Sequence, residues 1–373
     1  MPHSEDPALW LQLIRSRRIG PATFHRLLAD HGGVEAALRA LPGIAKASGV
    51  EDYEVCPMGI VRHEMSQGRA AKAVLLLFGG PGYPKALMDI ADAPPILWAQ
   101  GDVSLLSRPM VALVGARNAS SLGIRMARKL AESLGAAGQV VVSGLARGID
   151  AEAHLATLGT GTVAVQAGGV DVVYPVENGD IAEQILVKGA RVSEQPMGMA
   201  PQSRHFPQRN RIVSGLSRGV VVVEAAAKSG SLITAECALE QGREVFAVPG
   251  HPFDARAAGC NRLIRDGATL VRGAQDIFDV LHITARPPVV REVRTEEQVL
   301  PRPLPGPVPP RRPLSDMTNV HSLILARLGP SPMAEDQLIR DLAMAASSLT
   351  SELLTLELEG KIERQSGGLI SRA

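Results

Sequence analysis

Five short runs of β-branched and other apolar residues, spaced along the middle of the chain, constrain the fold most strongly. They are VALVG (111–115), VVVSG (140–144), TVAVQAGG (162–169), GVVVVEA (219–225) and EVFAVPG (244–250). Segments with helical periodicity, such as IRMARKLAESLGAAG and SLITAECALEQG, separate them. Continuous apolar strands that alternate with amphipathic helices are typical of a parallel sheet covered on both faces. We therefore predict an α/β fold with an extended Rossmann-like parallel sheet.

The regions that flank this sheet differ from it in composition. Residues 284–316 contain nine of the 27 prolines and almost no periodic apolar residues, which favours an extended linker. Residues 1–70 and 317–373 have helical patterns. A chain of 373 residues is expected to form two or three domains. We therefore predict a helical domain (1–70), the sheet domain (71–283), a proline-rich linker (284–316) and a C-terminal domain (317–373).

Cysteine content and hydropathy narrow the class of protein. Cys56, Cys237 and Cys260 have neither the number nor the spacing of a disulfide framework or a zinc site, so we expect packing roles, no metal and a reducing cytoplasm. The first residues, MPHSEDPALWLQLIRSR, lack the pattern of a signal sequence. No apolar run approaches the roughly 20 residues needed to cross a bilayer, so we expect no membrane partner.

The loops after three of the strands combine glycines with cations. Ligands of an open α/β sheet bind beyond the carboxyl ends of its strands. Glycines let the backbone approach a ligand, helix N-termini present N–H groups, and Arg or Lys supplies the opposing charge, so each loop resembles a phosphate site. The residues are Gly115, Arg117, Ser120 and Gly123 in the first loop, Gly144, Arg147 and Gly148 in the second, and Lys228, Ser229, Gly230, Ser231 and Thr234 in the third. Three such loops predict a surface for several phosphates.

Each of these features also has a structural explanation. A glycine after a strand is usually a turn residue, and a surface arginine is usually a solvated charge. The fingerprints GxGxxG and GxxxxGK[ST] are absent, which disfavours ordinary NAD and ATP binding. His154 could be taken for a catalytic base, but the sequence shows no partner for it. We expect structural roles for His154, Glu224 and Glu236.

The segment HFPQRNRIVSGLSRG (205–219) places an aromatic ring and three arginines just before a buried strand. A base can stack on a ring for ~1–3 kcal/mol while arginines follow the backbone, so Phe206 is a candidate contact for a single strand. The alternative, a core phenylalanine, stays open. The cations that we expect at one sheet edge are Arg204, Arg209, Arg211 and Arg218, with Arg117 and Lys228. They would form a cationic groove on a chain of net charge +1.

Longer motifs, in a fixed order, resemble the DNA-processing protein A family, also called DprA or Smf. They are VALVGARNASSLG, SGLARGIDAEAH, GGVDVVYPVEN, RVSEQPMG, FPQRNRIVSGLS, VVEAAAKSGSLITAECALEQGREVFAVPG and GCNRLIRDGA. The resemblance covers about residues 75–275. It implies a cytoplasmic bacterial protein that binds and protects single-stranded DNA, forms homodimers and loads the RecA recombinase during natural transformation. It implies no catalysis and no cofactor.

The resemblance also assigns candidate DNA contacts by motif. They are Arg117, then Phe206, Arg209, Asn210 and Arg211 of the FPQRNRI segment, and Lys228 to Ser231. The first loop reads Gly-Ala-Arg where the family commonly has Gly-Ser-Arg, so Ala116 removes a hydroxyl and leaves Arg117 in place. The full predicted DNA-binding set is Gly115, Arg117, Ser120, Arg147, Arg204, Phe206, Arg209, Asn210, Arg211, Lys228, Ser229, Gly230, Ser231 and Thr234.

The N-terminal region contains a weaker motif. In RIGPATFHRLLADHG (18–32), Ile19-Gly20-Pro21 followed by Thr23 resembles a helix-hairpin-helix, whose turn can present N–H groups to phosphates, and LPGIAKASG (41–49) could be a second copy. The family carries a sterile-alpha-motif-like (SAM-like) domain here, so the hairpins could serve only to pack helices. Residues 1–70 hold eight basic and eight acidic side chains, which favours packing.

Residues 317–373 predict three helices and a short β-wing about Gly367-Gly368, the order of a winged helix. The segment AASSLTSELLTLELEG has the position of a recognition helix, yet it contains three glutamates and no lysine or arginine. The region holds five basic and seven acidic side chains, so it would repel duplex DNA. We expect it to contact protein or to regulate.

Three functions remain open on the sequence. The motif series favours a recombination mediator that binds single-stranded DNA. The alternative is a nucleotide-processing enzyme of the lysine-decarboxylase-like phosphoribohydrolase group, because SGSLITAE resembles its PGGxGTxxE region, although Ala-Lys-Ser replaces Pro-Gly-Gly here. The third is a transcription regulator, which the acidic recognition helix disfavours.

Overall fold

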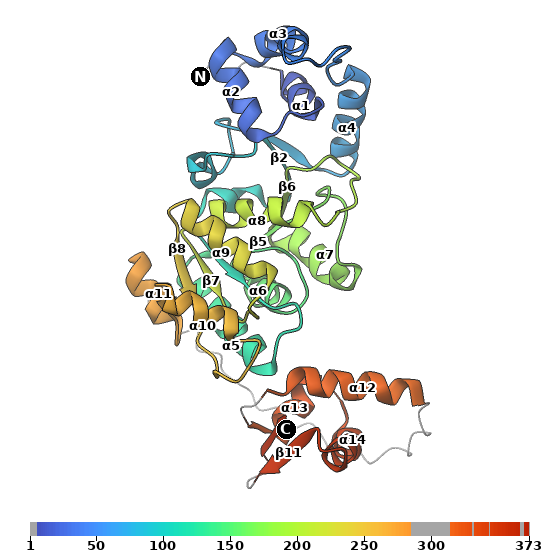
Figure 1. Cartoon of the computed structure of the whole chain (residues 1–373), viewed down its shortest axis with the longest axis vertical. Helices are drawn as coiled ribbons and strands as arrows, with labels where there is room; N and C mark the ends of the chain where they lie inside the picture. Colours follow the sequence, from blue (N-terminus) through green and yellow to red (C-terminus); the bar gives the residue numbers. More distant parts are fainter. Residues whose placement is uncertain (1–5, 285–313, 330–331, 343, 366–368, 373) are drawn as a thin grey trace, which may run out of the picture. The chain divides into compact units, whose positions relative to one another are not determined.

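The computed structural model describes residues 6–284, 314–329, 332–342, 344–365 and 369–372. It divides into two compact units, Met1–Thr284 and Ala285–Ala373, and each is described by itself (Figure 1). Among the described residues, no helix combines the length and the apolar character needed to span a bilayer.

The first unit begins with a small helical domain. Its helices are α1 (Pro7–Arg15), α2 (Pro21–His31), α3 (Val34–Ala47) and α4 (Met58–Ala70). Leu13, Phe24 and Leu41 form its core. The predicted turn at Ile19-Gly20-Pro21 joins α1 to α2, and Pro21 starts α2, where the missing N–H of proline costs nothing. The predicted second hairpin is wrong, because LPG lies inside α3.

A nine-stranded sheet follows in the described part of this unit, in the order β1-β2-β6-β5-β4-β3-β7-β8-β9. The strands are β1 (Val74–Leu77), β2 (Ile96–Gly101), β3 (Met110–Val114), β4 (Val140–Ser143), β5 (Thr162–Val165), β6 (Ala190–Ser193), β7 (Gly219–Val222), β8 (Glu244–Ala247) and β9 (Thr269–Leu270). Strands β3 to β9 pair in parallel, and β2 pairs antiparallel with β1 and β6. The predicted Rossmann-like sheet is confirmed, with an antiparallel edge added.

Helices cover both faces of this sheet (Figure 1). The neighbours Val141 and Val142 of β4 belong to two different cores, because side chains alternate across a strand. One face is covered by α8 (His205–Leu216), α9 (Gly230–Glu240) and α10 (Ala258–Arg265). The other is covered by α5 (Ser121–Ala136), α6 (Ile149–Thr157), α7 (Gly179–Lys188) and α11 (Ala274–Leu281). Short 3-10 helices lie at Lys85–Asp89, Val103–Ser107 and Val176–Asn178.

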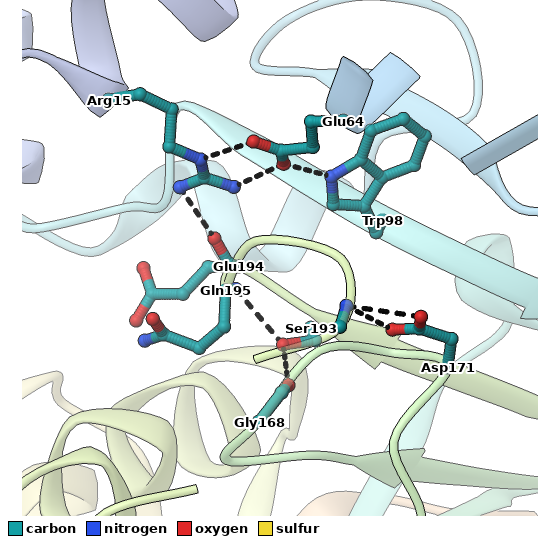
Figure 2. A network of polar contacts seen from close by, with 9 residues as sticks. Arg15, Glu64, Trp98, Gly168, Asp171, Ser193, Glu194 and Gln195 are labelled. Atoms are coloured by element: carbon teal, nitrogen blue, oxygen red, sulfur yellow. Dashed lines mark hydrogen bonds and ion pairs between the residues drawn. The ribbon is translucent and has the colours of Figure 1, made fainter. Parts of the chain in front are cut away.

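Arg15 of α1 fastens the helical domain to the sheet (Figure 2). Its guanidinium donates to the two carboxylate oxygens of Glu64 at 2.8 and 3.0 Å and to the carbonyl of Glu194 at 3.1 Å. Trp98 Nε1 of β2 donates to Glu64 at 2.8 Å. Glu64 is only 4% exposed, so these donors compensate a buried charge. Because Glu194 follows β6, the network also holds the start of the segment that leads to α8.

The same segment is held a second time below this network (Figure 2). Ser193 Oγ donates to the carbonyl of Gly168 at 2.6 Å and accepts from the N–H of Gln195 at 3.0 Å. The carboxylate of Asp171 accepts from the N–H of Gly198 at 2.9 Å. The path from the sheet to α8 is therefore set by side chains from several elements.

The second unit has the order of a winged helix. It comprises α12 (Leu314–Arg327), β10 (Met333–Ala334), α13 (Glu335–Leu342), α14 (Ala346–Leu358), β11 (Ile362–Gln365) and β12 (Leu369–Arg372), with strand order β10-β12-β11. Ile324, Leu338, Leu353 and Ile370 are in its core. The acidic segment predicted as a recognition helix is α14. The predicted wing tip at Gly367-Gly368 lies outside the described residues.

Candidate nucleic-acid interface

A groove of about 830 Å³ lies at the carboxyl ends of β3, β4 and β7. The loops after these strands, the start of α8 and the N-terminus of α9 form its walls, because parallel strands end at one edge of a sheet. Ten of the fourteen predicted residues line it: Gly115, Arg117, Phe206, Arg209, Asn210, Lys228, Ser229, Gly230, Ser231 and Thr234. The structure thus brings together the three loops that the sequence singled out.

Phe206 reaches this groove from the first turn of α8. Its ring centroid lies 5.6 Å from that of Tyr174, and Arg117 Cζ lies 5.4 Å from the Phe206 centroid. Phe206 is half-buried and belongs to none of the apolar cores of the described residues, so it is a groove residue rather than a core phenylalanine. Sequence reasoning missed Tyr174, which is 49% exposed. Its position after β5, in the motif GGVDVVYPVEN, was the available signal.

Arg147 lines a smaller cavity of about 300 Å³ that adjoins the groove. Arg117, Tyr174 and Phe206 line both cavities, so the two rings stand between them. Arg147 is exposed, and its Nη1 lies 3.9 Å from Glu177 Oε1, a pair that solvent screens strongly. A ligand in the groove could therefore extend past the rings toward Arg147.

Arg209 lies in the groove wall and is buried, with 8% of its surface exposed. Its guanidinium covers the backbone of Gly144, where a Cβ atom would fall 1.3 Å from Nη1, so any side chain at that position would displace the guanidinium. Asp150 of α6 accepts from the N–H groups of Gly144 at 3.0 Å and Ala146 at 3.4 Å. Burial raises the pKa of Asp150, and the charge of Arg209 opposes that shift. Arg209 therefore packs against the loop after β4 and supports its backbone. The carboxylate of Asp150 offsets the charge of Arg209.

The N-terminus of α5 is occupied by the protein's own carboxylate. Ser120 donates its N–H to Glu224 Oε1 at 3.0 Å and its hydroxyl to the same carboxylate. A Cβ atom at Gly123 would lie 2.5 Å from Glu224 Oε2. Burial raises the pKa of Glu224, and the hydrogen bonds from Ser120 oppose the shift. Because Ser120 caps the helix through Gly123 N–H and its own donors are bound to Glu224, Ser120 is not offered to a phosphate.

The N-terminus of α9, in contrast, faces the groove. Lys228, Ser229 and Gly230 line the groove there. The Ser229 hydroxyl caps the helix by accepting from the N–H of Ser231 at 3.4 Å. Asn210 Nδ2 of α8 donates to the Gly230 carbonyl at 3.3 Å and so joins the two helices. Backbone N–H groups beside a lysine give this end the features of an anion site.

Arg211 lies on another face of α8, although only one residue separates it from Arg209. It forms ion pairs with Asp92 at 2.8 Å and Glu194 at 2.7 Å, and its side chain is only 11% exposed. It lines a different cavity, of about 1030 Å³. Arg211 therefore joins α8 to the segment after β6, and the structure does not bring it into the groove.

The helix-hairpin-helix turn faces this second cavity. Gly20 and Pro21 line the cavity together with the acidic residues Asp89, Asp92 and Glu240. Carboxylates beside the turn disfavour a phosphate there. The geometry favours the packing role for this hairpin.

Two further arginines lie apart from the groove lining. Arg204 is exposed, and its Nε lies 3.3 Å from the ring nitrogen Nε2 of His205. Arg218 precedes β7, at the amino end of that strand, and donates to the carbonyl of Leu281. The expectation that Arg218 lies at the same sheet edge as Arg117 is wrong, because the groove lies at the carboxyl ends of the strands.

The remaining candidate for chemistry, His154, is fully buried in α6. Its Nδ1 lies 2.7 Å from the Thr162 hydroxyl, and burial lowers its pKa to about 3. This environment agrees with a structural role. In the described part of the chain, no group of three or more His, Cys, Asp or Glu side chains is arranged to hold a metal ion.

Family models match nearly the whole chain. They are DNA recombination-mediator protein A over residues 74–282, the DprA-like N-terminal HHH domain over 4–66 and the DprA winged helix domain over 308–368. The chain belongs to the DprA/Smf family. The N-terminal helices are thus a DprA-type HHH domain, and the matched family is one of DNA recombination mediators.

Individual DprA and Smf proteins agree with this assignment. Protein Smf of Synechocystis sp. is 33% identical over 393 aligned residues, which cover 98% of each chain. DNA processing protein DprA of Bacillus subtilis is 47% identical over 202 residues, 53% of this chain and 68% of its own.

Two solved DprA structures share the fold. DprA of Streptococcus pneumoniae matches with a TM-score of 0.63 and 36% identity, over 74% of this chain and 98% of its own. DprA of Helicobacter pylori, studied for its single-stranded DNA binding mode, matches with a TM-score of 0.53 and 30% identity, over 57% of this chain and 96% of its own.

Proposed function

We propose that this chain binds single-stranded DNA in the groove at the carboxyl ends of β3, β4 and β7. The observation that carries the proposal is the Phe206 ring, with Arg117 over it, in a groove that also contains Lys228 and the N-terminus of α9. A ring at the groove surface beside cations is the combination that binds single strands, because bases stack on the ring while cations neutralise the phosphates.

Each part of the groove has a distinct role in this proposal. Phe206 and Tyr174 stack on bases, and Arg117, Arg147 and Lys228 contact phosphates. Gly115, Asn210, Ser229 and Gly230 supply backbone and polar contacts. Arg209, Ser231 and Thr234 are buried and hold the walls in place. Ser120 and Arg211 are left out, because their side chains are bound to carboxylates of the protein itself.

The groove suits a single strand better than a duplex. The rings can stack only on bases that are free of a complementary strand. A major groove is read by a helix or ribbon that enters it, whereas here the loops after the strands and residues of α8 and α9 form the walls of a concave groove. We therefore propose little sequence preference.

The wider role follows the family. We propose that the protein protects incoming strands, loads RecA onto them during natural transformation, and acts as a homodimer in the cytoplasm. Membership of a recombination-mediator family supports the handover of DNA, and the buried thiols of Cys56 and Cys260 suit a reducing compartment. The net charge of −2 over residues 317–373 supports protein contact for the winged helix.

The phosphoribohydrolase alternative has less support. Glu236, the glutamate of SGSLITAE, is exposed on α9 and is absent from the groove lining. His154, the other candidate base, is buried. A general base must come within hydrogen-bond reach of its substrate, and neither residue meets that condition in the groove.

Two assays on the purified full chain separate the alternatives. Fluorescence anisotropy with a labelled oligonucleotide measures single-strand binding, and a second assay measures release of base from nucleoside monophosphates. The proposal predicts saturable binding without base release. Base release without oligonucleotide binding would contradict it.

A further inference from the structure

The loop between β8 and α10 holds an aromatic ring out in solvent. Phe253 is 89% exposed, more than any other aromatic residue that the structure describes. Its ring centroid lies 5.6 Å from that of His251, with the planes at 42°. A phenylalanine stabilises a fold mainly through burial of its ring, so a ring this exposed contributes little to the stability of the isolated chain.

The loop that carries this ring is braced. Asn261 of α10 makes two hydrogen bonds to the backbone of Gly250, at 3.0 and 3.1 Å. The N–H of Asp254 donates to the carbonyl of His251 at 2.9 Å, and the carboxylate of Asp254 accepts from the N–H of Arg256 at 3.0 Å. A ring on a fixed turn loses little conformational freedom when a ligand stacks on it.

The loop also borders the groove. β8 pairs in parallel with β7, with Ala247 opposite Val222, so the loops after the two strands emerge side by side. Arg256 of the β8 loop lines the groove. Gly259 at the start of α10 donates its N–H to the carbonyl of Ala225 at 2.8 Å, which packs α10 against the loop that carries Lys228. Figure 1 shows α9 and α10 on the same side of these strands.

The order of the β-strands places an aromatic residue on each side of the loops that carry the cations of the groove. Tyr174 follows β5, and Phe253 follows β8. Between these strands lie β4, β3 and β7, whose loops carry Arg147, Arg117 and Lys228. A DNA strand that crosses the groove along the sheet edge would therefore meet the rings of Tyr174 and Phe206 first, then the cations, and then the rings of Phe253 and His251.

We propose that Phe253 and His251 form a second stacking platform, which receives a base of the same single strand where that strand leaves the groove past Arg256. The proposal rests on the single-strand binding proposed above and extends its path. The platform would strengthen the binding only of DNA strands that are long enough to reach from Phe206 to the β8 loop.

The test uses the full chain with Phe253→Ala and a series of single-stranded oligonucleotides of increasing length. Loss of one stacked base corresponds to roughly fivefold weaker binding or more. We expect that loss only for the longer oligonucleotides, with the affinity for the shortest ones, the salt dependence and the melting temperature unchanged. Phe253→Trp should keep the parent affinity, and its added indole fluorescence should be quenched by the bound strand.

Val187→Ala is the matched control, because Val187 is 80% exposed on α7 and lies outside the groove lining. It should bind every length like the parent. If Phe253→Ala binds like the parent at every length while Phe206→Ala binds weakly, the second platform is excluded and the groove stands. If the parent binds no single strand, both proposals fail. If Phe253→Ala changes only the sedimentation of the protein, the ring is a contact between copies and the platform is excluded.

Discussion

The guanidinium of Arg117 lies over the ring of Phe206, with Cζ 5.4 Å from the ring centroid. Arg117 comes from the loop after β3, and Phe206 from the first turn of α8, so the contact joins two segments that are distant in the sequence. A cation–π pair that solvent reaches contributes about 0.5–1 kcal/mol, and here Arg117 is exposed while Phe206 is half-buried. The pair therefore places one charge and one stacking surface side by side, and substitutions can separate their effects on DNA binding.

Replacement of Arg117 by alanine should remove one phosphate contact. We expect weaker single-strand binding. We also expect the plot of log affinity against log salt to be less steep by about 0.7, the amount for one phosphate contact to a single strand. Anisotropy titrations at several salt concentrations measure both. Arg39→Ala is the control, because Arg39 is exposed on α3 and its substitution removes the same charge at a site far along the chain from Arg117. A parental slope for Arg117→Ala would show that Arg117 contacts no phosphate.

Replacement of Phe206 by alanine should weaken binding without changing that slope. Loss of stacking is worth ~1–3 kcal/mol, and the ring releases no counterion. The melting temperature should stay close to that of the parent, because a core phenylalanine would instead cost ~3–5 kcal/mol of stability. The salt titration and a thermal melt measure the two effects. A variant that melts and binds like the parent would leave the ring without a role.

Replacement of Arg211 by alanine should affect stability rather than DNA binding. The change leaves Glu194, whose side chain is only 15% exposed, without its partner. We expect a loss of about 2–3 kcal/mol in the free energy of unfolding, measured with urea, and an unchanged salt slope. Parental stability combined with a lower salt slope would return Arg211 to the set of phosphate contacts.

His154 should make stability depend on pH. Burial holds its folded-state pKa at about 3, below the value near 6.5 of an unfolded histidine. The unfolded state therefore binds the proton first, so this stabilisation is complete above pH ~6.5 and is lost toward pH ~3, by about 1.4 kcal/mol per pH unit. His154→Gln keeps a polar group near Thr162 and does not titrate. Its unfolding free energy should fall less steeply with acid than that of the parent, and parallel curves would contradict the prediction.

The central strands could be predicted because they are buried on both faces. The runs at β3, β4 and β7 are wholly apolar or nearly so, and the topology rule then places their loops at one edge. The edge strand β1 is short and only partly buried, so its pattern is weak, and its antiparallel pairing with β2 was not predicted.

The details of the site depend on contacts that the sequence does not display. Glu224 binds the N-cap residue of α5, Ser120, from a position 104 residues away, and nothing local marks it as different from a surface acid. Arg209 and Arg211 look equivalent in the sequence. However, side chains two positions apart on a helix point in directions that differ by about 200°. One therefore lies near Asp150, and the other meets Glu194 and Asp92.

The most direct test of the account is a competition between single-stranded and duplex DNA of the same length and at the same salt concentration, for binding to the full chain. Because the rings stack only on unpaired bases, we expect the single strand to bind about tenfold more tightly or better. Equal or tighter binding of the duplex would contradict the groove as a site for single-stranded DNA.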